Sequence, residues 1–243
     1  MTLYIVVLII LFVSTFTRSA LGFGDAVIAM PLLAMTIGIQ TATPLVAFVA
    51  ITISISILCK NWHVADIKAT WKLVLSSLAG IPLGLLMLKG VSEDLMKGML
   101  GTIIALYGFY NLIRPNIILR QDRFGLSYIF GFIAGVLGGA YNTNGPMVAI
   151  YGTIRHWPPR HFRATMQGYF LPTGFLILLG HGVSGLWTQK VLILYVLALP
   201  VVLLAVYLGG KVNRSLPQEQ FKKYIYSILI IMGLVLVWKS LPF

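Results

Sequence analysis

Long apolar segments separated by short polar stretches run the whole length of the chain, and their pattern occurs twice. Segments of roughly 18–21 apolar residues cross a hydrocarbon core about 30 Å thick, where a lone segment satisfies all its backbone groups only as a helix. The pattern therefore predicts an all-α integral membrane protein with five helical segments in each half. The predicted segments lie at about 3–17, 24–37, 41–59, 69–89 and 95–113, and then at about 124–138, 143–154, 164–181, 190–210 and 221–239.

Short matching motifs indicate that the two halves are copies of one unit. We expect the first repeat at 1–113, the second repeat at 124–243, and a linker at 114–123. The matching positions are Leu83-Gly84 with Leu208-Gly209, Gly108 with Gly233, Ala42-Thr43 with Ala164-Thr165, and Pro31 with Pro146.

The first two segments of each repeat are shorter than the others. At about 12–15 residues and a rise of about 1.5 Å per residue, each reaches only about 18–22 Å, which is less than a full crossing. The pairs at 3–37 and 124–154 are therefore either single broken spans or re-entrant hairpins that enter and leave on one side. Three full spans follow each pair.

The positions of the basic residues favour one of these arrangements. The chain has 18 Lys and Arg residues and a net charge of +12, and the basic residues gather in the loops. Broken spans would divide the loop cations eight to nine between the two sides, whereas an even number of crossings divides them thirteen to four. Because basic loops favour the cytoplasm, we expect an even number, and the short segments favour hairpins over two full crossings. The second repeat is then inverted, the linker is cytoplasmic and both termini are outside.

Both hairpins have a polar, glycine-containing tip, from Arg18 to Asp25 and from Gly138 to Pro146. The second arm begins at the tip, so its unpaired N–H groups and the positive end of its dipole lie within the membrane. Two such helix ends form a site for an anion. The expected contacts come from turn glycines and from neutral polar side chains, which are otherwise ordinary helix caps. These residues are Gly22, Gly24, Gly139, Asn142, Thr143 and Asn144.

Two charged residues lie inside the first hairpin. Arg18 is costly in an apolar region, by roughly 2.5–3.5 kcal/mol, and is interpreted either as a clamp for an oxyanion or as the structural partner of Asp25. Asp25 either carries a coupling proton or cation, or stabilises the first turn of the second arm. Gln167 and Tyr169 in the span after the second hairpin face the same site or join helices by hydrogen bonds.

Composition excludes several other classes of protein. Hydrophobic residues make up 58% of the chain and charged residues 10%, against about 25% charged in soluble domains. The basic residues lie in separate loops, which argues against nucleic acid as a partner. One cysteine, Cys59, permits no internal disulfide, and the sequence has no metal-ligand spacing, phosphate-binding loop or nucleophile motif. We therefore expect no enzyme activity, no cofactor and no metal.

The glycine-rich turns that lead to proline in each half resemble those of the TauE/SafE family of sulfite exporter-like proteins, also called the sulfonate uptake permease family. The matching stretches are Gly22-Phe23-Gly24 through Met30-Pro31-Leu32, and Gly135 to Gly139 through Gly145-Pro146. The resemblance extends over nearly the whole chain. It implies transport of sulfite, sulfoacetate or related sulfonates across the bacterial inner membrane.

Together these features predict a secondary transporter that holds a small anion at the hairpin tips and works by alternating access. A proton or sodium ion is the candidate coupling ion, the lipid bilayer is the surrounding partner, and both a monomer and a homodimer are compatible with the sequence. An anion channel and a non-transporting membrane assembly subunit are the alternatives.

Overall fold

The computed structural model describes residues 2–61, 67–113, 125–155, 157, 159–212 and 218–241, and within these ranges the regular structure is entirely helical. The helices in the first half are α1 (Thr2–Leu21), α2 (Asp25–Ile37), α3 (Ile39–Asn61), α4 (Ile67–Gly90) and α5 (Glu93–Ile113). Those in the second half are α6 (Leu126–Tyr141), α7 (Gly145–Ile154), α8 (Pro159–Val183), α9 (Gln189–Val212) and α10 (Gln218–Ser240). Each predicted segment corresponds to one helix.

The first helix is longer than its sequence pattern predicted. It contains 20 residues, whereas we expected an apolar arm that ended near residue 17. Its polar residues do not end it, because Ser14 and Thr17 donate to carbonyls one turn earlier and Ser19 donates to the Val206 carbonyl of α9. The helix continues until Gly22, whose φ is +96°.

Within the described residues, four helices contain stretches that are long and apolar enough to cross a membrane, namely α1, α3, α4 and α9. Helices α2 and α7 have 13 and 10 residues. They reach only about 20 and 15 Å, too short for a crossing. Helices α5, α8 and α10 have the length of a span, but each has charged residues in its first turns.

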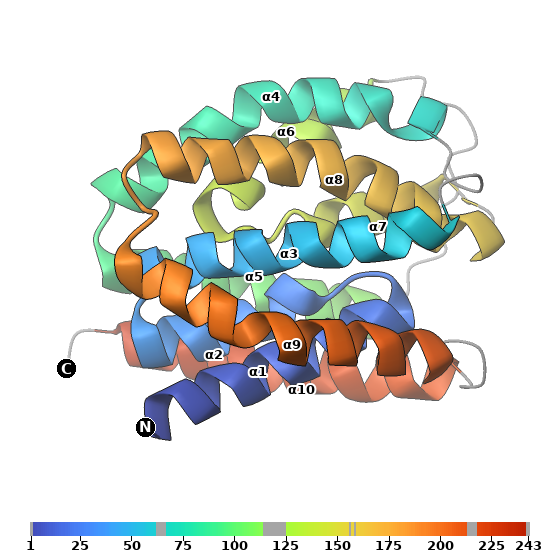
Figure 1. Cartoon of the computed structure of the whole chain (residues 1–243). Coiled ribbons are helices and arrows are strands. Elements are labelled where there is room, and N and C mark those ends of the chain that lie inside the picture. The colour runs from blue at the N-terminus through green and yellow to red at the C-terminus, as the bar shows by residue number, and fades with distance from the viewer. Residues whose placement is uncertain are drawn as a thin grey trace.

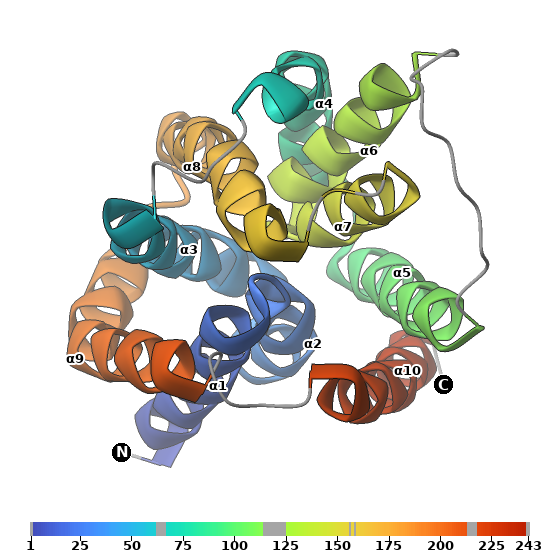
Figure 2. The ribbon, with the colours of Figure 1, turned by 90° about the vertical axis from the view of Figure 1, so that its right-hand side faces the viewer.

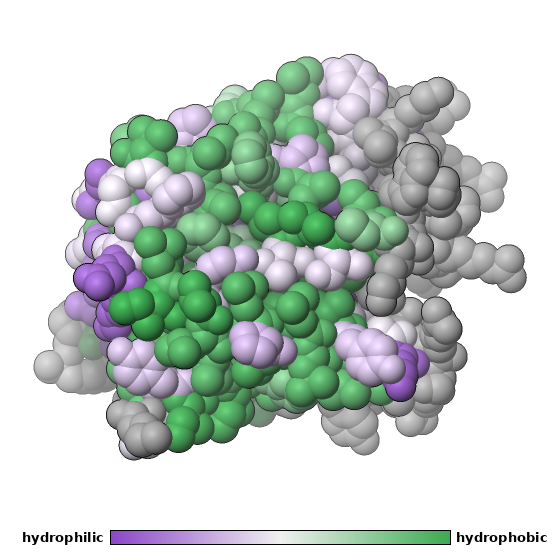
Figure 3. Space-filling model, viewed as in Figure 1, coloured by the Kyte–Doolittle hydropathy of each residue, from purple (hydrophilic) through white to green (hydrophobic). Residues whose placement is uncertain are grey.

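Helix α1 begins and helix α10 ends at the same end of the bundle, on the left in Figure 1. Seen from the opposite end, the helices pack as a bundle in which α2 and α7 occupy central positions (Figure 2). The space-filling view shows a broad hydrophobic surface over α3, α8 and α9, with polar residues toward its ends (Figure 3). Exposed apolar side chains such as Ile55, Phe175 and Val196 give this surface the character of one that faces lipid.

The two halves are interlocked through corresponding helices. Helix α4 of the first half packs closely on α6 of the second, and α9 of the second half packs on α1 of the first. Helix α5 pairs with α10, and α3 pairs with α8. The matched residues Gly84 and Gly209 lie at equivalent contacts, because a Cβ at Gly84 would meet the α6 backbone and one at Gly209 would meet the α1 backbone. Small residues allow membrane helices to approach this closely.

The turns at the two hairpin tips begin in the same way, although their N-cap residues differ, with φ of +104° at Gly24 and −77° at Asn144. The N–H of Gly22 donates to the Arg18 carbonyl at 2.7 Å, and the N–H of Asn142 donates to the Gly138 carbonyl at 2.7 Å. Both Gly22 and Asn142 have positive φ, and the next helix starts three residues later in each case. This geometry pairs Asp25 with Gly145, so the predicted match of Pro31 with Pro146 is wrong. Pro31 lies in the middle of α2, whereas Pro146 lies in the first turn of α7.

Candidate functional site

Arg18 is the centre of a buried polar cluster near the end of α1. The residue is 2% exposed, so its charge is almost completely removed from solvent. Its Nη1 atom donates to Asp25 Oδ2 at 2.6 Å, and its Nη2 atom donates to Ser54 Oγ at 2.6 Å and Gln167 Oε1 at 2.9 Å. Three helices besides α1 therefore hold the guanidinium group in place.

Helix α8 brings an amide and an aromatic ring to the same group. Gln167 accepts hydrogen bonds from both Arg18 and Ser54, and its Nε2 donates to the Gly22 carbonyl at 2.9 Å. Phe170 lies one turn further along α8, and its ring centroid is 4.8 Å from Arg18 Cζ. An aromatic face at this distance stabilises the cation without neutralising it.

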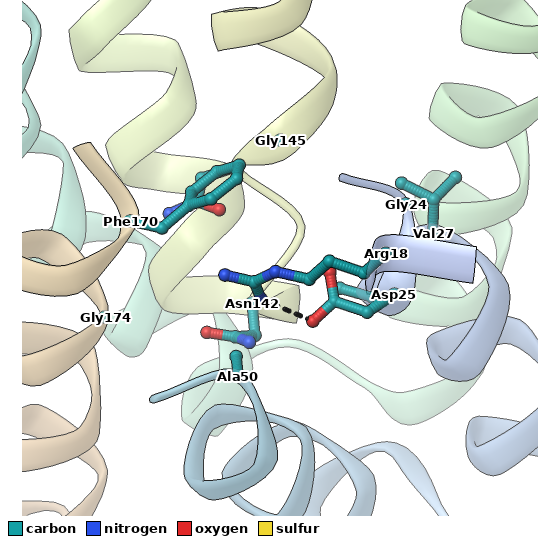
Figure 4. Close-up of a pocket in the computed structure, with 11 residues that line it drawn as sticks. Arg18, Gly24, Asp25, Val27, Ala50, Asn142, Gly145, Phe170 and Gly174 are labelled. Carbon is teal, nitrogen blue, oxygen red and sulfur yellow. Dashed lines mark hydrogen bonds and ion pairs between the residues drawn. The ribbon is translucent and has the colours of Figure 1, made fainter. Parts of the chain in front are cut away.

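A small cavity adjoins Arg18 and Asp25 (Figure 4). It provides about 20 Å³ for the centres of water-sized molecules, which is room for about one water. Residues from both halves line it, and Figure 4 shows Asn142 and Phe170 beside the guanidinium group of Arg18. The lining residues are Arg18, Gly24, Asp25, Ala26, Val27, Ala50, Asn142, Asn144, Gly145, Phe170 and Gly174.

The first turns of α2 and α7 both open onto this cavity. Gly24 and Asn144 are the N-cap residues, and neither makes a side-chain capping hydrogen bond, which disfavours the interpretation of Asn144 as an ordinary cap. The N–H groups of Asp25, Ala26 and Gly145 precede the first intrahelical hydrogen bonds of their helices. The positive ends of two helix dipoles therefore converge on one cavity, as anion binding requires.

One donor of the cluster is left over. The Nε atom of Arg18 is buried and has no hydrogen-bond partner among the described residues. A buried N–H without a partner is costly, so Arg18 Nε is a candidate donor to a water or a ligand in the adjoining cavity. The Arg18–Asp25 pair has no net charge, so the site in this state combines a neutral ion pair with unpaired N–H donors.

The structure brings together six of the nine residues that the sequence singled out. Five of them line the cavity and Gln167 binds Arg18 directly. The five are Arg18, Gly24, Asp25, Asn142 and Asn144.

The other three predicted residues have local roles. The carbonyl of Gly22 accepts a hydrogen bond from Gln167 beside the cavity. The hydroxyl of Thr143 donates to the Tyr141 carbonyl in its own turn at 2.9 Å, and a Cβ at Gly139 would meet the backbone of α4. Thr143 and Gly139 shape the second tip without lining the cavity.

Sequence reasoning missed two residues of the cluster. Ser54 lies in a span that also contains Thr52 and Ser56, and nothing in the pattern distinguishes the three. Phe170 follows Gln167 by three residues, so the helical period already places the two on one face. The spacing of three residues could therefore have predicted that Phe170 lies beside Gln167 at this cluster.

Two further polar residues of α8, Tyr169 and His181, make contacts with neighbouring helices. The Tyr169 hydroxyl is 2.7 Å from Ser77 Oγ, and Ser77 donates to the Gly131 carbonyl, so Tyr169 joins α8 to α4 and α6. His181 is buried, with Nε2 3.4 Å from the Gly139 carbonyl. In the part of the chain that the structure describes, no group of three or more His, Cys, Asp or Glu side chains has the arrangement of a metal site.

Comparisons with known proteins agree with this architecture. The family model described as "Sulfite exporter TauE/SafE" matches residues 6–236. The chain is 24% identical over 230 residues to a protein of Cupriavidus necator described as "Probable sulfite/organosulfonate exporter TauE", and the match covers 90% of this chain and 88% of that protein. No solved structure matches the chain. With a match over nearly its whole length, the chain belongs to the sulfite exporter TauE/SafE family, a family of membrane transporters and not of enzymes.

Proposed function

We propose that the protein is a secondary transporter that carries a small sulfur oxyanion, such as sulfite, sulfoacetate or another organosulfonate, across the bacterial inner membrane. The observation that carries this proposal is the position of Arg18, buried beside a cavity onto which the first turns of α2 and α7 open. The name of the Cupriavidus necator relative supports this substrate class.

The chemistry of the lining suits a sulfonate or sulfite group. Three oxygens share the charge of such a group, and several N–H donors from different directions satisfy them better than one strong cation. Arg18 Nε, the first-turn N–H groups of α2 and α7, and the side-chain amide of Asn142 are donors of this kind. Neutral donors hold an anion without trapping it, which a carrier requires for release.

Alternating access is the proposed mechanism, and an inverted repeat is its proposed basis. The equivalent packing of α4 on α6 and of α9 on α1 supports two related halves. The shortness of α2 and α7 supports tips that lie inside the membrane, although α1 is long enough to cross it. The thirteen-to-four division of the loop cations supports chain termini that are both outside. Because both halves line the cavity and it has room for about one water, a sulfonate enters only when the halves move apart.

Uptake of [³⁵S]sulfite into proteoliposomes tests the proposal. We expect saturable uptake and exchange against unlabelled sulfite with the wild-type protein, and loss of both in Arg18→Gln. Lys211→Gln is the matched control, because it removes an exposed cation that contacts Tyr207 at the end of α9. Flux that does not saturate would instead indicate a channel, and equal uptake by Arg18→Gln and the wild type would remove Arg18 from the site.

A further inference from the structure

We propose that Asp25 binds a proton whenever Arg18 holds the transported anion, so that one proton moves with each anion in the same direction. The inference rests on the proposed function and identifies the coupling ion of the same site. Arg18 would exchange one partner for another, with Asp25 bound in the empty carrier and the anion bound in the loaded one.

The hydrogen bonds of Arg18 favour this exchange. Nη1 donates to Asp25 and Nη2 donates to Ser54 and Gln167, so three of the five guanidinium N–H bonds are in use. Nε has no partner among the described residues, and Nη1, which Asp25 holds, has one further N–H. An anion gains the N–H that faces Asp25 only when Asp25 withdraws. Asp25 is the partner that carries charge of the same sign as the anion.

The net charge of the cluster also favours protonation of Asp25 when an anion binds. Arg18 and Asp25 sum to zero, and an anion beside them would place two negative groups close together in a buried site of low dielectric constant. Addition of a proton forms an O–H bond at Asp25 and breaks the hydrogen bond from Arg18 Nη1 to Oδ2. The released N–H then donates to the anion, and the site again sums to zero. Release of the anion and the proton restores the original pair.

A proton fits this site better than sodium. The carboxylate oxygen that a sodium ion would approach is 2.6 Å from a guanidinium nitrogen, so the second cation would be repelled. Sodium also needs a shell of several oxygen ligands, and in the described part of the cavity lining Asp25 is the one carboxylate, with the side-chain amides of Asn142 and Asn144 as the other side-chain oxygen groups. A proton needs no shell of ligands, and it removes the negative charge of Asp25.

No other ionisable side chain in the described residues competes for this role. Helices α1, α3, α5, α7 and α10 pack against α2, and among their charged side chains that the structure describes, Arg18 alone forms an ion pair with Asp25. Glu93 and Lys97 of α5 lie at the far end of α2, beside Gly38 and Ile39. Helix α8 contributes Gln167 and Phe170, which do not ionise, and its His181 contacts α6. Tyr107 of α5 packs on Tyr226 of α10, and Tyr151 of α7 packs on Phe130.

Proton uptake on binding is measurable by isothermal titration calorimetry on the purified protein in detergent. Isethionate is the probe, because the charge of this sulfonate does not change between pH 5 and pH 8. Titration in two buffers that differ in ionisation enthalpy gives the number of protons taken up. We expect about one proton per isethionate for the wild type at a pH where Asp25 is ionised, and the same for the exposed control Asp94→Asn.

Asp25→Asn resembles the protonated state, because its side chain carries no charge, and it tests the proposal directly. We expect this variant to bind isethionate without proton uptake and with little dependence on pH. Binding with no proton uptake by the wild type, undiminished proton uptake by Asp25→Asn, or loss of binding by a folded Asp25→Asn would each overturn the proposal. If Asp25→Asn does not fold, Asp25→Glu replaces it, and is expected to bind with proton uptake.

Proteoliposomes separate failure of the coupling from failure of the transport function. With the membrane potential clamped, wild-type vesicles that contain a pH-sensitive dye should acidify as isethionate enters. Asp25→Asn vesicles should exchange labelled for unlabelled isethionate without acidification. Uptake without acidification, or uptake that requires sodium, would overturn the proton proposal and leave the transporter intact. No uptake or exchange of either sulfite or isethionate by the wild type would instead overturn the proposed function.

Discussion

Gln167 Nε2 donates to the carbonyl oxygen of Gly22 at 2.9 Å, although the two residues are 145 positions apart. The other end of the same amide accepts from Arg18. The side chain of Gln167, in the second half, therefore binds both the turn between α1 and α2 and the guanidinium group of Arg18.

Replacement of Gln167 by Glu should abolish sulfite uptake. The new carboxylate would place a second negative charge beside Arg18. One of its oxygens would face the Gly22 carbonyl oxygen, where Gln167 has an N–H donor. A buried carbonyl left without its donor costs about 1–3 kcal/mol, or about five- to a hundredfold in affinity. Uptake by proteoliposomes checks the expectation, with Gln189→Glu at the exposed start of α9 as the control. Wild-type uptake by Gln167→Glu would contradict the role of this amide.

Gly24→Ala should lower both stability and uptake. Gly24 has φ of +104°, and an L side chain in such a conformation costs about 1–2 kcal/mol. Gly185 is the matched control, because it also has positive φ and a Cβ there would meet nothing within 4 Å. We expect Gly185→Ala to lower the melting temperature similarly without loss of uptake, because only Gly24 positions the first turn of α2. Equal uptake by the two variants would contradict this.

Gly84→Ala should destabilise the protein by separating α4 from α6. The new Cβ would overlap the Val136 carbonyl oxygen and the Ala140 nitrogen, which are backbone atoms that cannot turn away. Overpacking of this kind costs about 1–3 kcal/mol. Gly90 ends the same helix with nothing within 4 Å of its Cβ position, so Gly90→Ala should leave the melting temperature nearly unchanged. Thermal unfolding of both variants in detergent checks the difference.

Glu93 links the start of α5 to the start of α3. Its Oε1 lies 3.0 Å from Lys97 Nζ and accepts a hydrogen bond from the N–H of Ile39 at 3.2 Å. Partial burial raises the pKa of Glu93, but the bonds to Lys97 and Ile39 outweigh it and lower the pKa below its ordinary value of 4.5. The folded state therefore binds this proton less readily than the unfolded state.

The contribution of Glu93 to stability should accordingly be complete above pH 4.5 and should disappear as the pH falls through the lowered pKa of the folded protein. We expect Glu93→Gln to melt at a lower temperature than the wild type near pH 6, with the difference closing in more acidic buffers. The neighbouring Asp94→Asn is the control, and a difference that stays constant with pH would contradict the assignment.

The sequence alone was sufficient to predict an all-helical membrane protein and to single out residues that line one cavity. Arg18 and Asp25 stand out because charges are rare in apolar segments, and both line the cavity. The end of α1 was not predictable from hydropathy, because Ser14 and Thr17 satisfy their hydroxyls on their own helix and so remain compatible with it.

The partners of Arg18 were harder to predict than Arg18 itself. Ser54 and Thr52 lie two residues apart on α3, and only the packing decides that Ser54 binds Arg18 while Thr52 lies 2.8 Å from the Tyr195 hydroxyl. The tip pattern likewise identified a turn at residues 142–144 without showing that Thr143 points back into it. Long-range side-chain partners depend on helix rotation, which a single sequence leaves open.

The interlocking of α1 with α9 and of α4 with α6 has a consequence for biosynthesis. Helix α1 meets its main neighbour only after α9 has been synthesised, so its serines and Arg18 must be tolerated in the lipid or by the insertion machinery until then. Neither half can be completed as an independent folding unit. A truncated product that ends after α5 would lack α9, on which α1 packs, and α6, on which α4 packs.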